Sequence, residues 1–299
     1  MISAVLNFLK PPGMTSHDAV SFVRRIYQQK RVGHSGTLDP AAAGVLPIYL
    51  GNATRLVEYA DSFDKTYRAE VLLGIKTDTG DDTGRVLQHK TVELPAKQQL
   101  EEIVRSFQGG YEQIPPMYSA IKIDGRKLYE LARAGQEVER QPRRIEIPMI
   151  KLMAVHDCRL TIEVTCSKGT YIRTLCEDIG FRLGMPATMS LLLRTRVGPF
   201  AANQASTIEE ITADPVKALL PADFAVSELP AFTLNETETG HLTHGRPIMK
   251  NVSELPGDRD LILRLYDCQQ NFFGIGRLDA ATGLLRPIKI FSGEMGAPC

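Results

Sequence analysis

The chain has 299 residues, and its 35 basic and 35 acidic side chains give a formal net charge of zero. A hydrophobic fraction of 43% is ordinary for a folded protein, and the length allows one large domain or one large and one small domain. No apolar run reaches membrane-spanning length and no signal-peptide pattern is present, so we expect a cytoplasmic protein with no membrane partner.

The cysteines indicate a reducing compartment. Their number is odd, and no two of them form a C-x-x-C pair. The five are Cys158, Cys166, Cys176, Cys268 and Cys299. We therefore expect reduced thiols, with neither a disulfide framework nor a metal site.

Charge is distributed unevenly along the chain. Basic side chains outnumber acidic ones before Thr207, and the reverse holds from there onward. Between residues 10 and 34 the only acid is Asp18. The basic side chains there are Lys10, Arg24, Arg25, Lys30 and Arg31. Such a local basic surface suits contacts with nucleic-acid phosphates, although a solvated helix face explains the charges equally well.

The chain opens with a short apolar run, 5–9, followed by a helix. Lys10 and the Pro-Pro-Gly after it end the run. Lys10 is either a phosphate contact or part of a rigid corner, and the corner is the interpretation that we favour. Thr15 or Ser16 caps the helix. The predicted buried stripe of this helix holds Ala19, Val20, Val23, Ile26 and Tyr27.

Residues 33–47, GHSGTLDPAAAGVLP, have neither helical nor strand periodicity. Glycines and prolines punctuate them, which predicts a shaped loop. The loop carries one carboxylate, Asp39, which the following Pro40 directs toward an extended backbone. A loop of small residues that presents a single acid suits a nucleophile. An ordinary Asp-Pro turn explains the same residues on loop chemistry alone.

Helices and strands alternate after this loop. Residues 52–59 are predicted to be helical, and 67–73 form a strand with Tyr67 on its apolar face. The segment 77–84 resembles a calcium loop superficially, but it lacks the closing glutamate, so we interpret it as a hairpin connection. An amphipathic helix around 100–107 follows, and Gly109-Gly110 is predicted to stop it.

Residues 111–145 are basic and weakly patterned, with only a short helical segment near 128–134. A long excursion inside a domain is often functional, and a flexible surface insertion is the alternative. Beyond it, 160–166 alternates as a strand and 167–169 turns the chain into a helix. Tyr171 and Arg173 fall in the first turn of that helix, where an anion can bind, but the turn lacks phosphate-loop spacing.

The C-terminal part of the chain has a different sequence pattern. Three closely spaced strands are predicted over 261–266, 272–277 and 284–291, which is typical of a small β-barrel. We place the domain boundary near residue 228. This gives one domain over 1–228, with the basic insertion about 111–145, and a second over 229–299.

Several of these segments, in the same order, resemble the signatures of the TruB family of tRNA pseudouridine synthases. The resemblance implies an α+β pseudouridine-synthase fold: a central mixed, largely antiparallel sheet flanked by helices, plus a PUA-like RNA-binding barrel at the C-terminus. Residues 244–246, 274–276 and 286–287 carry the weaker PUA likeness. The family segments are 10–16 (KPPGMTS), 33–47, 64–67 (DKTY), 74–84, 118–122 (YSAIK), 169–173 (GTYIR) and 192–195 (LLRT).

The resemblance also implies an activity and a set of site residues. The family converts uridine 55 in the T-loop of tRNA to pseudouridine. By this likeness Asp39 is the catalytic carboxylate, Tyr67 the active-site aromatic and Arg173 the ion-pair partner of Asp39. His34 fills the space left by the everted base, and Tyr171 and Leu192 line the uracil pocket. Lys10 is carried over as a further RNA-binding residue.

The implied chemistry suits these residue types. The reaction rejoins the same uracil through another atom, so it requires no cofactor, and the sequence offers no cofactor motif. A nearby guanidinium favours the ionised form of a carboxyl, which Asp39 needs. Tyr67 or Asp39 itself handles the C5 proton, and the sequence does not choose between them. The expected partner is the T-arm of tRNA, bound by a monomer.

Two other classes of protein stay open. One is a non-catalytic tRNA-binding or tRNA-folding module on the same scaffold, which would not need Asp39. The other is a hydrolase with an aspartate nucleophile that acts on small molecules. It would need a water-activating base near Asp39 and would not need a basic RNA clamp.

Overall fold

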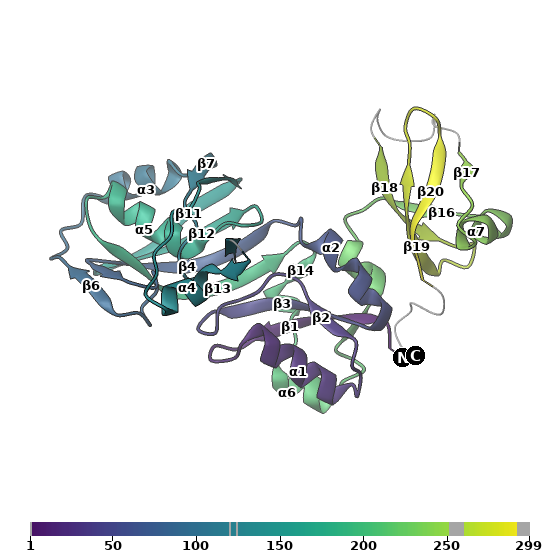
Figure 1. Cartoon of the computed structure of the whole chain (residues 1–299), viewed down its shortest axis with the longest axis horizontal. Coiled ribbons are helices and arrows are strands. Elements are labelled where there is room, and N and C mark those ends of the chain that lie inside the picture. Colours follow the sequence, from purple (N-terminus) through teal and green to yellow (C-terminus); the bar gives the residue numbers. More distant parts are fainter. Residues whose placement is uncertain (1, 120, 124, 251–259, 292–299) are drawn as a thin grey trace. The chain divides into compact units, whose positions relative to one another are not determined.

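The computed structural model describes residues 2–119, 121–123, 125–250 and 260–291 (Figure 1). The chain forms two compact units. The first unit contains Met1–Asp39, Val45–Asp61 and Gly198–Cys299, and the second contains Pro40–Gly44 and Ser62–Val197.

In the first unit, β1 (Ala4–Lys10) lies between β3 (Ala43–Leu50) and β15 (Leu219–Pro221), and β2 (Val32–His34) pairs with β3. The helix α1 (Ser16–Ile26) begins with the expected cap, because Thr15 and Asp18 form a capping box. Its apolar side packs on a core made by β1, β2 and β3. The remaining short elements are η1 (Gly51–Leu56), α2 (Val57–Ala60), β14 (Phe200–Ala201), η2 (Ala202–Gln204), α6 (Ile208–Ala213) and η3 (Ala222–Val226).

The C-terminal part of this unit is a five-stranded curled sheet with its own small core. The strand order is β16-β18-β19-β20-β17. The three predicted strands are confirmed, and the curled sheet is consistent with a PUA-like domain. The bounds are β16 (Ala231–Thr233), α7 (Glu236–Thr243), β17 (Ile248–Met249), β18 (Leu261–Tyr266), β19 (Phe272–Leu278) and β20 (Leu284–Ile290).

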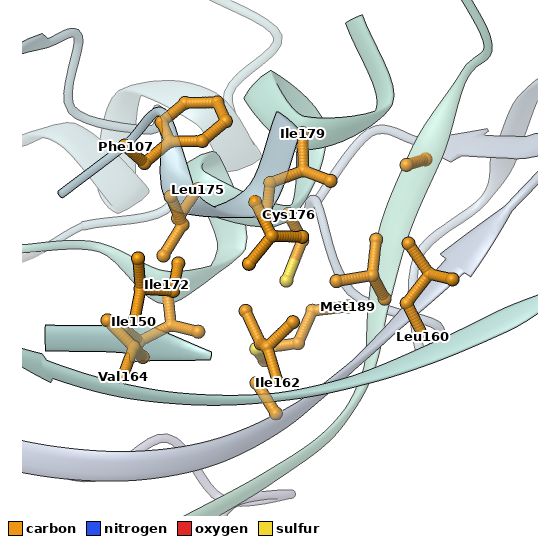
Figure 2. Packing of buried hydrophobic residues seen from close by; sticks show 14 of the residues in the cluster. Phe107, Ile150, Leu160, Ile162, Val164, Ile172, Leu175, Cys176, Ile179 and Met189 are labelled. Carbon is orange, nitrogen blue, oxygen red and sulfur yellow. The ribbon is translucent and has the colours of Figure 1, made fainter. Parts of the chain in front are cut away.

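The second unit is built on antiparallel strands in the order β11-β12-β4-β13. Ala43 and Gly44 add a short parallel pairing with β13, which makes the sheet mixed. The helices α3 and α5 pack on the sheet, where α3 contacts β11 and α5 contacts β13 and β4. Figure 2 shows apolar side chains of α5 next to those of β12 and β13. The bounds are β4 (Lys65–Leu73), α3 (Lys97–Arg105), β11 (Met149–His156), β12 (Arg159–Cys166), α5 (Ile172–Arg182) and β13 (Ala187–Val197).

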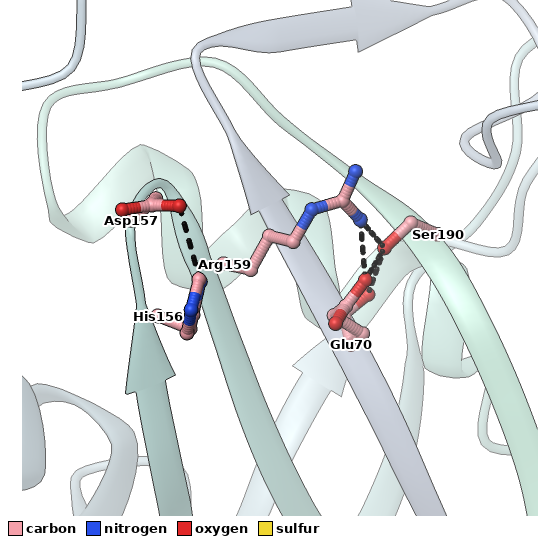
Figure 3. A network of polar contacts seen from close by, with 5 residues as sticks. All are labelled: Glu70, His156, Asp157, Arg159 and Ser190. Atoms are coloured by element: carbon pink, nitrogen blue, oxygen red, sulfur yellow. Dashed lines mark hydrogen bonds and ion pairs between the residues drawn. The ribbon is translucent and has the colours of Figure 1, made fainter.

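A polar network links three neighbouring strands of this sheet (Figure 3). Glu70 of β4 accepts a hydrogen bond from the Ser190 hydroxyl at 2.6 Å, and it is ion-paired with Arg159. Arg159 also donates to the Ser190 hydroxyl at 3.2 Å. The Ser190 bond comes first among the causes that lower the pKa of Glu70. The network therefore fastens β12, β4 and β13 to each other as long as Glu70 is ionised.

Several predicted connections need correction. The 77–84 segment does connect a hairpin, β5 (Ile75–Thr77) with β6 (Val86–His89). However, Gly109 and Gly110 do not stop a helix; α3 already ends at Arg105, and the glycines open β7 (Gly109–Gln113). The insertion is also more ordered than predicted, because it contains more than its short helix. Its elements are β8 (Lys122–Ile123), β9 (Arg126–Lys127), α4 (Leu128–Arg133) and β10 (Arg143–Ile147), which pairs with β7.

The loop predicted over 33–47 is shorter than expected. Its two ends are strands, because β2 ends at His34 and β3 begins at Ala43. The β3 strand has no alternating pattern because nearly all of its side chains are buried. Pro47 is tolerated there because its carbonyl still accepts a bond, from the Ser35 N–H at 3.2 Å. Only residues 35–42 form the irregular loop.

Candidate active site

Asp39 lies half-buried near the middle of this short loop. The start of the loop is fixed by Ser35, which is buried and shares a hydrogen bond with the Tyr49 hydroxyl at 3.3 Å. Its far end requires a glycine. Gly44 has a φ of +119°, and an added Cβ would lie 2.2 Å from the Arg194 carbonyl oxygen. These contacts hold the main chain on either side of the loop that carries Asp39.

Ser16, the first residue of α1, holds the loop directly before Asp39. Its hydroxyl accepts a hydrogen bond from the Leu38 N–H at 2.9 Å and donates one to the Leu38 carbonyl at 3.1 Å. Both residues are buried, so neither main-chain group can rely on water. The sequence interpretation treated Ser16 only as a possible cap, and Thr15 fills that role. The Ser16–Leu38 contact was therefore missed.

Lys10 supports the rigid-corner interpretation. Its side chain is fully buried, and its ammonium group donates to the Pro11 carbonyl at 2.9 Å and the Met14 carbonyl at 2.7 Å. These bonds close the corner that leads into Ser16 and α1. The carried-over role of Lys10 in binding RNA stays a prediction.

The second unit contributes an aromatic and an apolar side chain on adjacent strands. Tyr67 of β4 lies opposite Arg194 of β13, and Leu192 lies opposite Ala69. Tyr67 and Leu192 are both half-buried against the apolar core of this unit. They can therefore present an apolar surface of the kind that a uracil ring requires.

Arg173 is buried in the first turn of α5. One guanidinium nitrogen donates to the Thr79 carbonyl at 2.9 Å, and the other donates to the Tyr118 carbonyl at 2.8 Å. A guanidinium has five N–H donors in a fixed plane, so these two bonds set its orientation. Arg173 thus fastens the 77–84 turn and the start of the basic insertion to α5.

Tyr171 is the N-cap residue of α5, with extended φ and ψ of −102° and 110°. The sequence placed Tyr171 in the first turn of this helix, but it lies one position before that turn. Its main chain is held by Gln113, a residue to which the sequence interpretation gave no role. The only sequence signal was its place next to Pro115-Pro116, where the basic insertion begins.

Two carboxyl groups on α5 lie near these residues. Burial raises the pKa of Glu177, and the positive charges of Lys76 and Arg173 act against that rise. Burial likewise raises the pKa of Asp178, which Arg182 and a hydrogen bond with Tyr111 oppose. The helix that carries Tyr171 and Arg173 therefore lies in a strongly desolvated, charged setting.

The predicted residues are divided between the two units. Asp39, His34 at the end of β2, and Lys10 belong to the first unit. The second unit holds the others, which are Tyr67, Tyr171, Arg173 and Leu192. The ion pair between Asp39 and Arg173 stays a prediction. Each unit therefore supplies part of the predicted set, and the chemistry that this set would perform stays a prediction.

Comparisons with known proteins place the fold among pseudouridine synthases. The chain is 25% identical to a protein in the "Crystal Structure of a Cbf5-Nop10-Gar1 Complex", with a TM-score of 0.77 over 99% of this chain and 87% of that one. A second structure, of an H/ACA RNP bound to a substrate RNA containing 2'-deoxyuridine, shares the fold at a TM-score of 0.70 and 23% identity.

Three family models cover most of the sequence. The N-terminal domain model of the TruB family pseudouridylate synthases matches residues 24–172. A tRNA pseudouridylate synthase B C-terminal domain model matches 173–227, and a pseudouridine synthase II TruB C-terminal model matches 230–291. The chain belongs to the TruB family.

Curated relatives agree with this assignment. A tRNA pseudouridine synthase B of Caldanaerobacter subterraneus subsp. tengcongensis is 42% identical over 97% of this chain and 99% of its own length. A tRNA pseudouridine synthase B of Azoarcus sp. is 41% identical over 99% of this chain and 97% of its own length. In the part of the chain that the structure describes, none of the helices combines the length and apolar character needed to span a bilayer.

Proposed function

We propose that this chain isomerises uridine 55 in the T-loop of tRNA to pseudouridine. Membership of the TruB family supports a pseudouridine synthase that acts on tRNA, because the models and the full-length relatives agree over nearly the whole chain. The observation that carries the assignment of the site is Asp39 on a short loop whose backbone Ser16 holds through both Leu38 main-chain groups. The proposed catalytic groups are Asp39, Tyr67 and Arg173.

The proposed reaction uses these groups as follows. The N1–C1′ bond breaks, and the same uracil re-forms its bond to C1′ through C5. Asp39 either attacks C1′, forming a bond that breaks again when C5 attacks, or takes the C2′ proton to leave a glycal and returns that proton when C5 bonds to C1′. Tyr67 or Asp39 accepts the proton from C5 while N1 gains one. No electron is transferred, so the balance requires no redox cofactor. Arg173 would pair with the Asp39 carboxylate, and Tyr171 and Leu192 would retain the cleaved base.

The target base must leave its stack before C1′ can be reached, and His34 would occupy the space that it vacates. RNA of this kind is recognised by shape, by splayed bases and by phosphate contacts. The basic insertion is the proposed clamp on the T-arm. Its Lys122, Arg126 and Arg133 side chains are exposed, as phosphate contacts require.

The domain organisation is part of the same proposal. Residues 1–228 would form the catalytic domain and 229–299 a PUA-like RNA-binding domain. One family model ends at residue 227 and the next begins at residue 230, which supports this division. We further infer a monomer in the cytoplasm, in keeping with an enzyme that acts on a free tRNA.

The test is to incubate tRNA transcript with the purified protein and to map every pseudouridine. We expect one modified position, in the T-loop, and none with Asp39→Asn. That variant should still bind tRNA within about tenfold of wild type, a change of roughly 1.4 kcal/mol. Asp157→Asn is the matched control, because Asp157 is exposed and its φ of +49° suits asparagine equally well.

The possible outcomes separate the proposals. Full activity of Asp39→Asn would overturn the catalytic role of Asp39. Tight tRNA binding by a wild-type protein that forms no pseudouridine would favour a non-catalytic tRNA-binding module. Modification at another position in tRNA would leave the reaction in place and overturn the T-loop assignment.

A further inference from the structure

Gln113 lies at the point where the sheet of the second unit gives way to the basic insertion. It is the last residue of β7, and its side chain is 2% exposed. A buried amide has four hydrogen-bonding positions that must be satisfied within the protein. The partners of Gln113 are therefore informative about what the residue does.

Two of these partners are the main-chain groups of one residue, Tyr171. The Tyr171 N–H donates to Oε1 of Gln113 at 2.8 Å, and Nε2 of Gln113 donates to the Tyr171 carbonyl at 3.1 Å. The orientation of the amide is fixed by its partners, because an N–H can only donate and a carbonyl can only accept. Gln113 thus binds Tyr171 as the main chain of a neighbouring strand would.

Tyr171 needs such a partner because of its position. The N-cap residue of a helix has an N–H that the helix's own bonds do not use. Its carbonyl already accepts from the Leu175 N–H at 3.1 Å, and Gln113 occupies the second lone pair. With both groups bound, the backbone of Tyr171 is fixed and the first turn of α5 begins at a defined place.

A second set of contacts holds Gln113 itself. Its Nε2 also donates to the Tyr111 hydroxyl at 2.7 Å. Tyr111 and Gln113 both belong to β7, so this bond connects two side chains of the same strand. The network therefore runs from the N-cap of α5 into β7, and it restrains the start of the helix against sliding along the strand.

We propose that Gln113 is a positioning residue for the reaction, which sets the place of Tyr171 and, through the first turn of α5, that of Arg173. This inference rests on the roles proposed above for Tyr171 and Arg173. Arg173 provides a second tie of the same kind, through its bond to the Tyr118 carbonyl. The root of the basic insertion is therefore fastened to the start of α5 at two points.

The test compares single-turnover rates of pseudouridine formation at saturating tRNA with tRNA affinity. Gln113→Met keeps the size of the side chain and removes all three hydrogen bonds. We expect its rate to fall at least tenfold while its Kd for tRNA stays within threefold of wild type. Gln113→Glu keeps the acceptor for the Tyr171 N–H but places an oxygen against the Tyr171 carbonyl. The Gln113→Glu variant should fold, and its single-turnover rate should also be lower than that of wild type.

Two controls separate positioning from loss of stability. Gln108→Met removes an exposed glutamine that donates to the Pro148 carbonyl at 3.0 Å, and it should leave the rate unchanged. Val104→Ala opens a cavity in the same core and should lower the Tm without slowing the reaction. If both Gln113 variants react at the wild-type rate, or if Val104→Ala is slowed as much as they are, the proposal is wrong.

The failure of the proposed function is distinguishable from the failure of this inference. Tyr171→Leu keeps the main chain that Gln113 binds and removes only the aromatic side chain. A fully active Tyr171→Leu would overturn the proposed pocket role of Tyr171. A slow Tyr171→Leu together with fully active Gln113 variants would leave that role in place and overturn the positioning role of Gln113 alone.

Discussion

Replacing Lys10 with methionine separates the two roles that its sequence position allows. Met is close to Lys in volume, so the change removes the ammonium group without opening a large cavity. Two carbonyls, of Pro11 and Met14, then lose a charged donor. Each such bond contributes about 1.5–3 kcal/mol. The variant no longer buries a charge, which offsets part of the lost bond energy. The net loss in the free energy of unfolding is therefore about 2–4 kcal/mol.

A loss of about 3 kcal/mol corresponds to a fall of about 6–12 °C in Tm for a domain of 150–250 residues. We would measure thermal unfolding together with the salt dependence of tRNA binding. If Lys10 only shapes the corner, the slope of log K against log salt should not change. Lys217→Met is the matched control, because Lys217 is exposed in the same unit and lies outside the basic segments. An unchanged Tm with a slope reduced by about 0.7–0.9 would show that Lys10 contacts a phosphate instead.

Four other perturbations follow from the same contacts. Arg173→Lys should slow single-turnover pseudouridine formation at least tenfold, because one ammonium nitrogen does not replace the planar guanidinium, which binds the Thr79 and Tyr118 carbonyls through two separate nitrogens; wild-type turnover would contradict this. Ser16→Ala should cost about 1–3 kcal/mol of stability and slow the reaction, whereas Ser21→Ala on the exposed side of α1 should do neither. Glu70 has a pKa lowered by its bond from Ser190, so its stabilisation is present above pH 4.5 and is lost as the pH falls through the lower folded value. Unfolding of Glu70→Gln should therefore differ from wild type at pH 7 and converge with it in acid, and a constant difference would refute the assignment. Wild-type tRNA binding should weaken steeply with salt; a flat dependence would mean that the basic segments do not touch RNA.

The sequence predicted the periodic elements well. The Ala69, Val71 and Leu73 side chains alternate on β4 as expected, and α1 begins within a residue of its predicted start. These elements show clear periodicity because one face of each meets the core and the other does not. A few consecutive residues carry the pattern, so it can be recognised without knowledge of residues that are distant in the sequence.

The ends of the Asp39 loop were not predictable in this way. β3 is buried along nearly its whole length, so it shows no alternation, and it contains a proline. Its strand conformation depends on pairing with β2 and with Leu193 and Arg194, more than a hundred residues away in the chain. Local propensity favoured a loop, and long-range pairing overrode it.

The catalytic candidates came from motifs, but the contacts that hold them did not. Ser16 binds Leu38 across 22 positions, and Gln113 binds Tyr171 across 58. A single serine or glutamine has no periodicity, and its partners are main-chain groups that every residue possesses. No spacing rule can therefore identify such a pair from one sequence.

The two contacts nevertheless share one physical logic. In each case a buried polar side chain binds both the N–H and the carbonyl of a single residue: the residue directly before Asp39, or the one two positions before Arg173. A side-chain contact would fix only one rotamer, whereas a main-chain contact fixes the origin from which the next side chains project. Substitutions of Ser16 and Gln113 should therefore displace reacting groups that they do not touch, and a search for catalytic residues by side-chain identity alone would overlook both.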